Sequence, residues 1–283
     1  MHATDLPRVA SGEPERPQGR FVLPAFGARS AIERDHLYWF GTRGLIFTSP
    51  WVLTADTERQ TAVILLSASG RPLELTVAGR AARHRAFAIA PLTRRGLRAV
   101  DVGLISVNVQ PHHPSFAALS RIGRPGARPL SRAAFARFDI DLVRAYQGRL
   151  SHREAEVLFE DLVEATLEQL ADAGARDERA EFLHALLREN PDCSLGEIAR
   201  RLNVSYTAAS HLFARRVGLP LRTYQHWIKC MRATQHFRAG IPLTEIAQLA
   251  GFTDSAHLSR TWQRRFGMPP SYLRDDRHVH VIS

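Results

Sequence analysis

The segment GFTDSAHLSRTWQRRFGMPPSYLR, residues 251–274, concentrates side chains that could bind a polyanion. Arg260, Arg264 and Arg265 lie close together there, and short polar side chains precede them. An arginine guanidinium can donate two hydrogen bonds to a guanine edge, or it can contact a phosphate. The residue types therefore point to nucleic-acid chemistry, provided that one helix presents all three arginines.

A helix capped by Thr253 or Asp254 would meet that condition. The apolar side chains Leu258, Trp262 and Phe266 then fall on one face and anchor the helix. Four polar side chains of its N-terminal half are left to meet base edges: Ser255, His257, Ser259 and Arg260. Arg264 and Arg265 follow one turn later, where phosphates would lie.

An internal repeat extends this pattern. SLGEIARRLNVS, from Ser194, matches PLTEIAQLAGFT, from Pro242, and FARRVGLP later matches WQRRFGMP. Each copy predicts a short helix, a turn and a second helix, which is a helix-turn-helix unit. Ser194 and Glu197 have the spacing of a capping box, which Pro242 cannot supply in the second copy. Arg215 and Arg216 repeat the arginine pair and are predicted phosphate contacts.

Between the two copies, about 18 residues from Leu221 are predicted to form one helix, which would be roughly 27 Å long. Such a rigid spacer could hold two recognition helices close to one DNA turn apart, roughly 34 Å. Lys229, the only lysine of the chain, and Arg232 fall away from the predicted core face and are assigned to phosphates. The predicted core face consists of Leu221, Tyr224, Ile228, Met231 and Phe237.

The tandem units resemble the C-terminal signature of the AraC/XylS family of bacterial transcription regulators, over about residues 176–274. The resemblance implies a DNA-binding domain that inserts recognition helices 205–217 and 254–266 into successive major-groove segments. It also implies an activator that contacts RNA polymerase at a promoter. The implied base-edge positions are Thr207, Ser210, His211, Ser255, Ala256, Ser259 and Arg260. His211 departs from the arginine most frequent there, and Ala209 departs from the usual leucine.

The residues before the tandem units, taken together with those units, predict an α+β chain. Residues 21–145 alternate short apolar runs with Gly, Pro and charged breaks, which indicates a small antiparallel β-domain. It resembles only a degenerate cupin-like sensor barrel, because His84 lacks the His-x-His partner of metal-binding cupins. The other predicted parts are a disordered segment, 1–20, a helical linker, 146–175, the helix-turn-helix domain, 176–275, and a tail, 276–283.

The linker opens with Ser151 and Glu154 in capping-box spacing and then places Leu158 and Leu162 on one face. Two interpretations are open. The helix packs on its own domain, or Leu158 and Leu162 form the seam of a homodimer.

Composition narrows the function classes. Among 283 residues, 38 Lys+Arg against 28 Asp+Glu give a net charge of +10, which favours an anionic partner. Cys193 and Cys230 fit neither a disulfide framework nor a zinc site. Without a signal peptide or an apolar span, a cytoplasmic location is expected. No metal or cofactor is expected, and the histidines at 112–113, 278 and 280 are expected to be solvated.

Two other classes remain open. The chain could be an enzyme or repair domain fused to an AraC-type DNA-targeting module, although no nucleophile elbow or phosphate loop is seen. It could also be a DNA-architectural protein without sequence preference. A small-molecule effector or a protein partner could bind the N-terminal domain.

Overall fold

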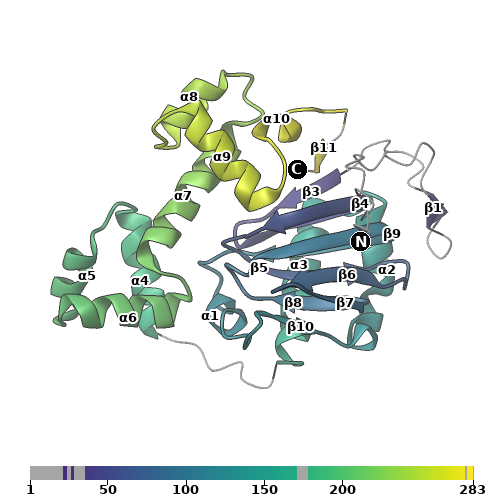
Figure 1. Ribbon diagram of the computed structural model, residues 1–283, viewed down its shortest axis with the longest axis horizontal. Coiled ribbons are helices and arrows are strands. Elements are labelled where there is room, and N and C mark those ends of the chain that lie inside the picture. The colour runs from purple at the N-terminus through teal and green to yellow at the C-terminus, as the bar shows by residue number, and fades with distance from the viewer. Residues whose placement is uncertain (1–21, 24–26, 29–35, 171–177, 278, 283) are drawn as a thin grey trace, which may run out of the picture.

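The computed structural model describes residues 22–23, 27–28, 36–170, 178–277 and 279–282. A curled sheet occupies the N-terminal half, and helices make up the C-terminal half (Figure 1). This is the predicted α+β arrangement. The predicted disordered segment 1–20 and the joint near residues 171–175 lie outside the described residues.

Within the described residues, nine strands form one sheet in the order β10–β8–β5–β9–β4–β3–β11, with β6 paired to β9 and β7 to β6. They are β3 (His36–Phe40), β4 (Gly44–Thr57), β5 (Ala62–Ser67), β6 (Leu73–Val77), β7 (Arg80–His84), β8 (Ala86–Ile89), β9 (Arg95–Val109), β10 (Ala127–Pro129) and β11 (Val279–Ile282). A separate pair joins β1 (Val22–Leu23) to β2 (Gly27–Ala28).

The sheet curls toward a barrel along its two longest strands, β4 and β9. Their antiparallel register shifts between Ser49 and Trp51 and again between Thr54 and Thr57. Such bulges bend a strand and increase its twist. The predicted antiparallel near-barrel is confirmed.

Both faces of the sheet are covered, as β5 shows most clearly. All its residues are buried, and successive side chains point to opposite faces. Ile64 and Leu66 pack in the cluster that contains the N-terminal helices, whereas Val63 and Leu65 pack in the cluster that contains C-terminal helices. The sheet therefore connects the two halves of the molecule through its own core.

The helices of the N-terminal half are α1 (Phe116–Leu119), the 3-10 helix η1 (Arg132–Phe138), α2 (Asp139–Tyr146) and α3 (His152–Leu167). Helix α3 starts with the predicted capping box of Ser151 and Glu154. Leu158 and Leu162 are 3% and 0% exposed within the N-terminal core. The dimer seam proposed for these two leucines is wrong, because their own domain already buries this face.

The C-terminal helices are α4 (Glu178–Glu189), α5 (Leu195–Leu202), α6 (Tyr206–Val217), α7 (Leu221–His236), α8 (Leu243–Leu249), α9 (Ser255–Phe266) and α10 (Pro270–Leu273). Helices α5–α6 and α8–α9 are the two helix-turn-helix units, and α7 runs between them (Figure 1). The turns contain Asn203 and Gly251, which occupy equivalent repeat positions and have φ of 51° and 79°. Ala199 and Ala247 are buried where the paired helices cross.

The end of the chain differs from the predicted solvated tail. Strand β11 pairs in parallel with β3, with Val279 opposite His36 and His280 opposite Leu37. Val279 is buried, and His280 is half-buried. His278 lies outside the described residues. The C-terminal segment thus completes the edge of the N-terminal sheet.

Candidate nucleic-acid interface

The first recognition helix, α6, is fixed from its inner face. The Ser205 side chain caps it by accepting a hydrogen bond from the Ala208 backbone N–H at 3.2 Å. Ala209, Phe213 and Val217 are buried. The small Ala209 is accommodated because Leu212 packs, partly buried, against the same cluster. The predicted base-edge residues Thr207, Ser210 and His211 are exposed on the outer face.

The second recognition helix, α9, begins at Asp254 rather than Thr253. The Asp254 carboxylate accepts a hydrogen bond from the His257 backbone N–H at 2.6 Å. Leu258 and Trp262 are buried, as predicted. Of the base-edge residues, Ala256 and Arg260 are exposed, and Ser255 and Ser259 are half-buried.

Of the caps of the preceding helices, only that of the first unit is weaker than the sequence suggested. In the first unit, Ser194 accepts from the Glu197 backbone N–H at 3.2 Å, which is one half of the predicted capping box. In the second unit, Pro242 makes no side-chain cap, as expected.

The predicted phosphate-contacting residues differ in exposure. Arg215 and Arg264 are exposed, whereas Arg216, Lys229 and Arg232 are half-buried.

Arg265 is already engaged by the N-terminal domain. Its guanidinium donates to the Glu58 carboxylate at 2.6 Å and to the Glu58 carbonyl oxygen at 3.2 Å. Its side chain is therefore only 14% exposed, and Arg264 lies 3.8 Å from the same carboxylate. Sequence reasoning missed this contact, because nothing in the β-rich pattern distinguishes Glu58 from other surface acids.

The N-terminal domain contacts corresponding points of both helix-turn-helix units. Gly218 and Gly267 end α6 and α9 with φ of 86° and 75°. A Cβ at Gly218 would lie 2.7 Å from the Ser120 hydroxyl, and one at Gly267 would lie 3.0 Å from the Thr54 methyl carbon. The C-terminal ends of the recognition helices therefore face the N-terminal domain, and the reading residues lie toward the opposite ends.

One exposed aromatic side chain was also missed. Tyr206, the first residue of α6, is 64% exposed. Its phenol could donate to a phosphate from the position where helix N-terminal N–H groups also attract anions. The signal was available, because Tyr206 directly follows the capping Ser205.

The histidines of the N-terminal half are arranged for packing. His113 is 3% exposed and lies 3.0 Å from the Glu160 carboxylate, so the expectation that it is solvated is wrong. The His112 Nε2 lies 2.5 Å from the carbonyl oxygen of Thr42. Burial lowers the pKa of both imidazoles. In the described part of the chain, no group of three or more His, Cys, Asp or Glu side chains could hold a metal ion.

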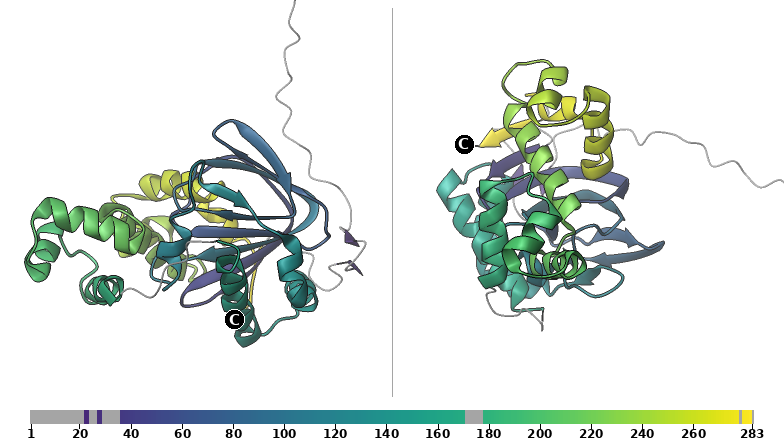
Figure 2. Two further views of the ribbon diagram at one scale, coloured as in Figure 1. Left: turned by 90° about the horizontal axis from the view of Figure 1, so that it is seen from below. Right: turned by 90° about the vertical axis from the view of Figure 1, so that its left-hand side faces the viewer.

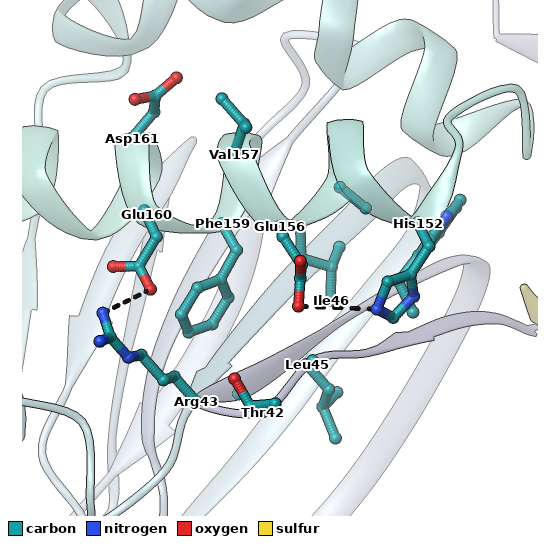
Figure 3. Close-up of a pocket in the computed structure, with 14 residues that line it drawn as sticks. Thr42, Arg43, Leu45, Ile46, His152, Glu156, Val157, Phe159, Glu160 and Asp161 are labelled. Atoms are coloured by element: carbon teal, nitrogen blue, oxygen red, sulfur yellow. Dashed lines mark ion pairs between the residues drawn. The ribbon is translucent and has the colours of Figure 1, made fainter. Parts of the chain in front are cut away.

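An open groove of about 430 Å³ lies between α3 and the turn that joins β3 to β4 (Figure 3). Arg43 faces Glu160 at 3.5 Å, and His152 faces Glu156 at 3.6 Å. Arg43 and Glu160 thus form an ion pair across a partly exposed surface, where such pairs contribute little.

Comparison with known proteins agrees with this architecture. Residues 198–276 match the family described as "Helix-turn-helix domain". A structure of apo ToxT from Vibrio cholerae strain SCE256 has a TM-score of 0.51 at 10% identity, covering 82% of this chain and 96% of ToxT. ToxT from Vibrio cholerae O395, bound to (E)-4-(8-methylnaphthalen-1-yl)but-3-enoic acid, has a TM-score of 0.51 at 11% identity, covering 86% and 98%. Comparison with curated protein sequences gave no match.

The helix-turn-helix match supports a DNA-binding transcription regulator, and the ToxT structures show the same overall fold. The matched residues include both of the tandem units that resemble the AraC type, so the match agrees with that resemblance. None of the helices in the described ranges is long and apolar enough to cross a bilayer.

Proposed function

We propose that this protein regulates transcription, as an activator, by reading one asymmetric double-stranded DNA site through both recognition helices. The observation that carries the proposal is the continuous helix α7, whose 16 residues join the two units. It spans about 24 Å. One chain therefore holds two different reading surfaces at a fixed separation. A palindromic site has two identical halves and would not match them.

The reading surfaces are the exposed N-terminal halves of α6 and α9. The proposed base contacts are Thr207, Ser210 and His211 on α6, and Ser255, Ala256, Ser259 and Arg260 on α9. The proposed phosphate contacts are Arg215, Arg216, Lys229, Arg232, Arg264 and Arg265. Since Arg265 is held by Glu58, we propose that DNA competes with Glu58 for this guanidinium.

Selection of bound sequences from random double-stranded DNA by the full-length protein tests the proposal. The expected motif has two unlike boxes in fixed order. Recovery of no motif would instead support the architectural class, and a palindrome would contradict reading by both helices of one chain.

We further propose that the protein activates transcription and responds to a small-molecule effector. ToxT has been crystallised with a butenoic acid derivative, and its fold resembles this one. We propose that the N-terminal domain likewise binds a small-molecule effector. The effect of this binding would reach the DNA-reading surface through the contacts of the N-terminal domain with α9. Transcription in vitro with purified RNA polymerase should increase when the protein occupies its selected site. Reduced transcription at that site would identify a repressor.

A further inference from the structure

A second, more enclosed cavity lies between strands β3, β4 and β9 of the sheet and the second helix-turn-helix unit. Phe47 and Asn108 line it from the sheet, and Trp262 and Phe266 line it from α9. Its volume is about 50 Å³, and most of its lining is apolar. A single water needs roughly 10–15 Å³, so the cavity holds more than one solvent-sized group.

The cationic side chain of Arg59 lines this cavity. The Arg59 guanidinium lies 5.3 Å from the Phe47 ring centroid and 5.9 Å from that of Phe266. It donates to the Asn108 amide oxygen at 2.6 Å, but within the described residues it forms no ion pair. The adjacent Glu58 is already bound to Arg265. Buried charges in proteins are normally paired, so this arrangement lacks a negative charge.

A second arginine, which is buried, increases this excess of positive charge. Arg95 is 4% exposed and donates to the Thr93 carbonyl oxygen at 3.2 Å. Burial, and then the nearby charge of Arg59, lower the pKa of Arg95 to about 9. Burial also lowers the pKa of Arg59. Two guanidiniums thus share a weakly solvated region.

The hydrogen-bond inventory of the cavity shows the same imbalance. Among the described residues, the Nε of Arg59 and the Nε1 of Trp262 are buried donors without a hydrogen-bond partner. In the same part of the chain, the Gln110 side-chain amide donates only to the Met231 sulfur, at 3.6 Å. A thioether is a weak acceptor, and leaving a buried donor unsatisfied costs about 1–3 kcal/mol. The cavity therefore has spare donors and a shortage of acceptors.

We propose that this cavity is a binding site for a small organic monocarboxylate, with its carboxylate at Arg59 and its apolar chain against Met231 and Met268. A carboxylate supplies the missing charge and the missing acceptors at once, which a neutral ligand cannot do. This inference rests on the effector of the proposed function: it says where that effector binds and that it is an anion. Binding is measured without DNA, so a failure to read DNA leaves this test intact.

The test compares butyrate and hexanoate with butan-1-ol and hexan-1-ol on the full-length protein. Binding is followed by calorimetry and by the midpoint of thermal unfolding, since a ligand of the folded state raises that midpoint. We expect each carboxylate to bind at least about tenfold more tightly than its alcohol. Equal binding of acid and alcohol, or no binding of either acid at millimolar concentration, would overturn the proposal.

Variants then assign the site. Arg59→Gln should weaken hexanoate binding at least about tenfold. The matched control Arg94→Gln changes an exposed arginine that pairs with Asp56, and it should bind hexanoate as the wild type does. If Arg59→Gln does not fold, Trp262→Phe removes the spare N–H donor together with part of the indole ring and should still weaken binding severalfold. Wild-type affinity in the folded variant, or preference for inorganic phosphate over hexanoate, would contradict a carboxylate site here.

Discussion

Arg260 and Arg264 lie one turn apart on α9, yet their predicted partners differ. Arg260 is exposed on the half that follows the Asp254 cap, and Arg264 lies beside Glu58. Arg260→Ala should cost about 1–3 kcal/mol at the selected site and relax preference at one base pair. Arg264→Ala should weaken specific and non-specific DNA alike and reduce the salt slope by about one. Titrations at several salt concentrations measure both effects, and an equal loss of selectivity in the two variants would contradict the assignment.

His184 makes folding stability depend on pH. Burial, followed by the charges of His112 and Arg188, lowers its pKa from 6.5 to about 4, and its ring packs against Tyr224. The unfolded chain therefore takes up this proton more readily than the folded one. The contribution is fully present above about pH 6.5 and is lost as the pH falls toward 4, by at most about 3 kcal/mol.

Denaturant unfolding of the wild type and of His184→Leu between pH 7 and pH 4 checks this dependence. The variant should lose less stability on acidification than the wild type does, whereas the exposed control His211→Gln should retain the full dependence. Parallel curves for the wild type and His184→Leu would show that His184 does not contribute.

At the scale of elements, the contact between the end of β4 and α9 should oppose DNA binding. Glu58 pairs with Arg265 at 2.6 Å and with Arg264 at 3.8 Å. Glu58→Gln removes the competing charge, so DNA affinity should rise and the salt slope should steepen by about one. The matched control Glu74→Gln changes an acid paired with Arg83 on the β6–β7 hairpin and should leave both unchanged. Weaker DNA binding by Glu58→Gln would contradict competition and indicate that Glu58 positions Arg265.

Helix α3 is part of the N-terminal core, and its substitution should report on stability. Leu162 is fully buried, so Leu162→Ala should lower the free energy of unfolding by about 2–5 kcal/mol without changing the oligomeric state. Val157, on the same helix, is 57% exposed, and Val157→Ala should cost much less. Sedimentation and denaturant unfolding measure both quantities. If Leu162→Ala instead dissociated a wild-type dimer and left stability unchanged, Leu162 would belong to a homodimer interface after all.

The helices could be predicted from sequence because their signals are local. Ser151, Asp254 and the two C-terminal glycines, Gly218 and Gly267, mark helix boundaries within a few residues of the apolar positions that they serve. Pairings between distant segments carry no such signal. Residues 276–283 were expected to form a tail, because nothing local in Val279–Ile282 indicates that β3 is its partner, and Glu58 contacts Arg265 across most of the chain. The predicted core face of α7 was also incomplete: it included Tyr224 but not Trp227 and Cys230, which are buried as well.

At the scale of the whole molecule, the N-terminal domain and the expected DNA surface lie at opposite ends of each recognition helix. Gly218 approaches Ser120, and Gly267 approaches Thr54. The C-terminal helices project from one side of the curled sheet (Figure 2). The repeat thus presents two equivalent ends to one domain, so a change in that domain can reach both reading helices.

Hydroxyl-radical footprinting of the full-length protein on its selected site tests most directly the claim that one chain reads DNA twice. We expect two unlike protected boxes on one face of the duplex, centred about 10–10.5 bp apart. His211→Ala should weaken protection of the box read by α6, and Arg260→Ala that of the box read by α9. A single protected groove segment, or a palindrome bound by two chains, would show that one of the two units does not engage DNA.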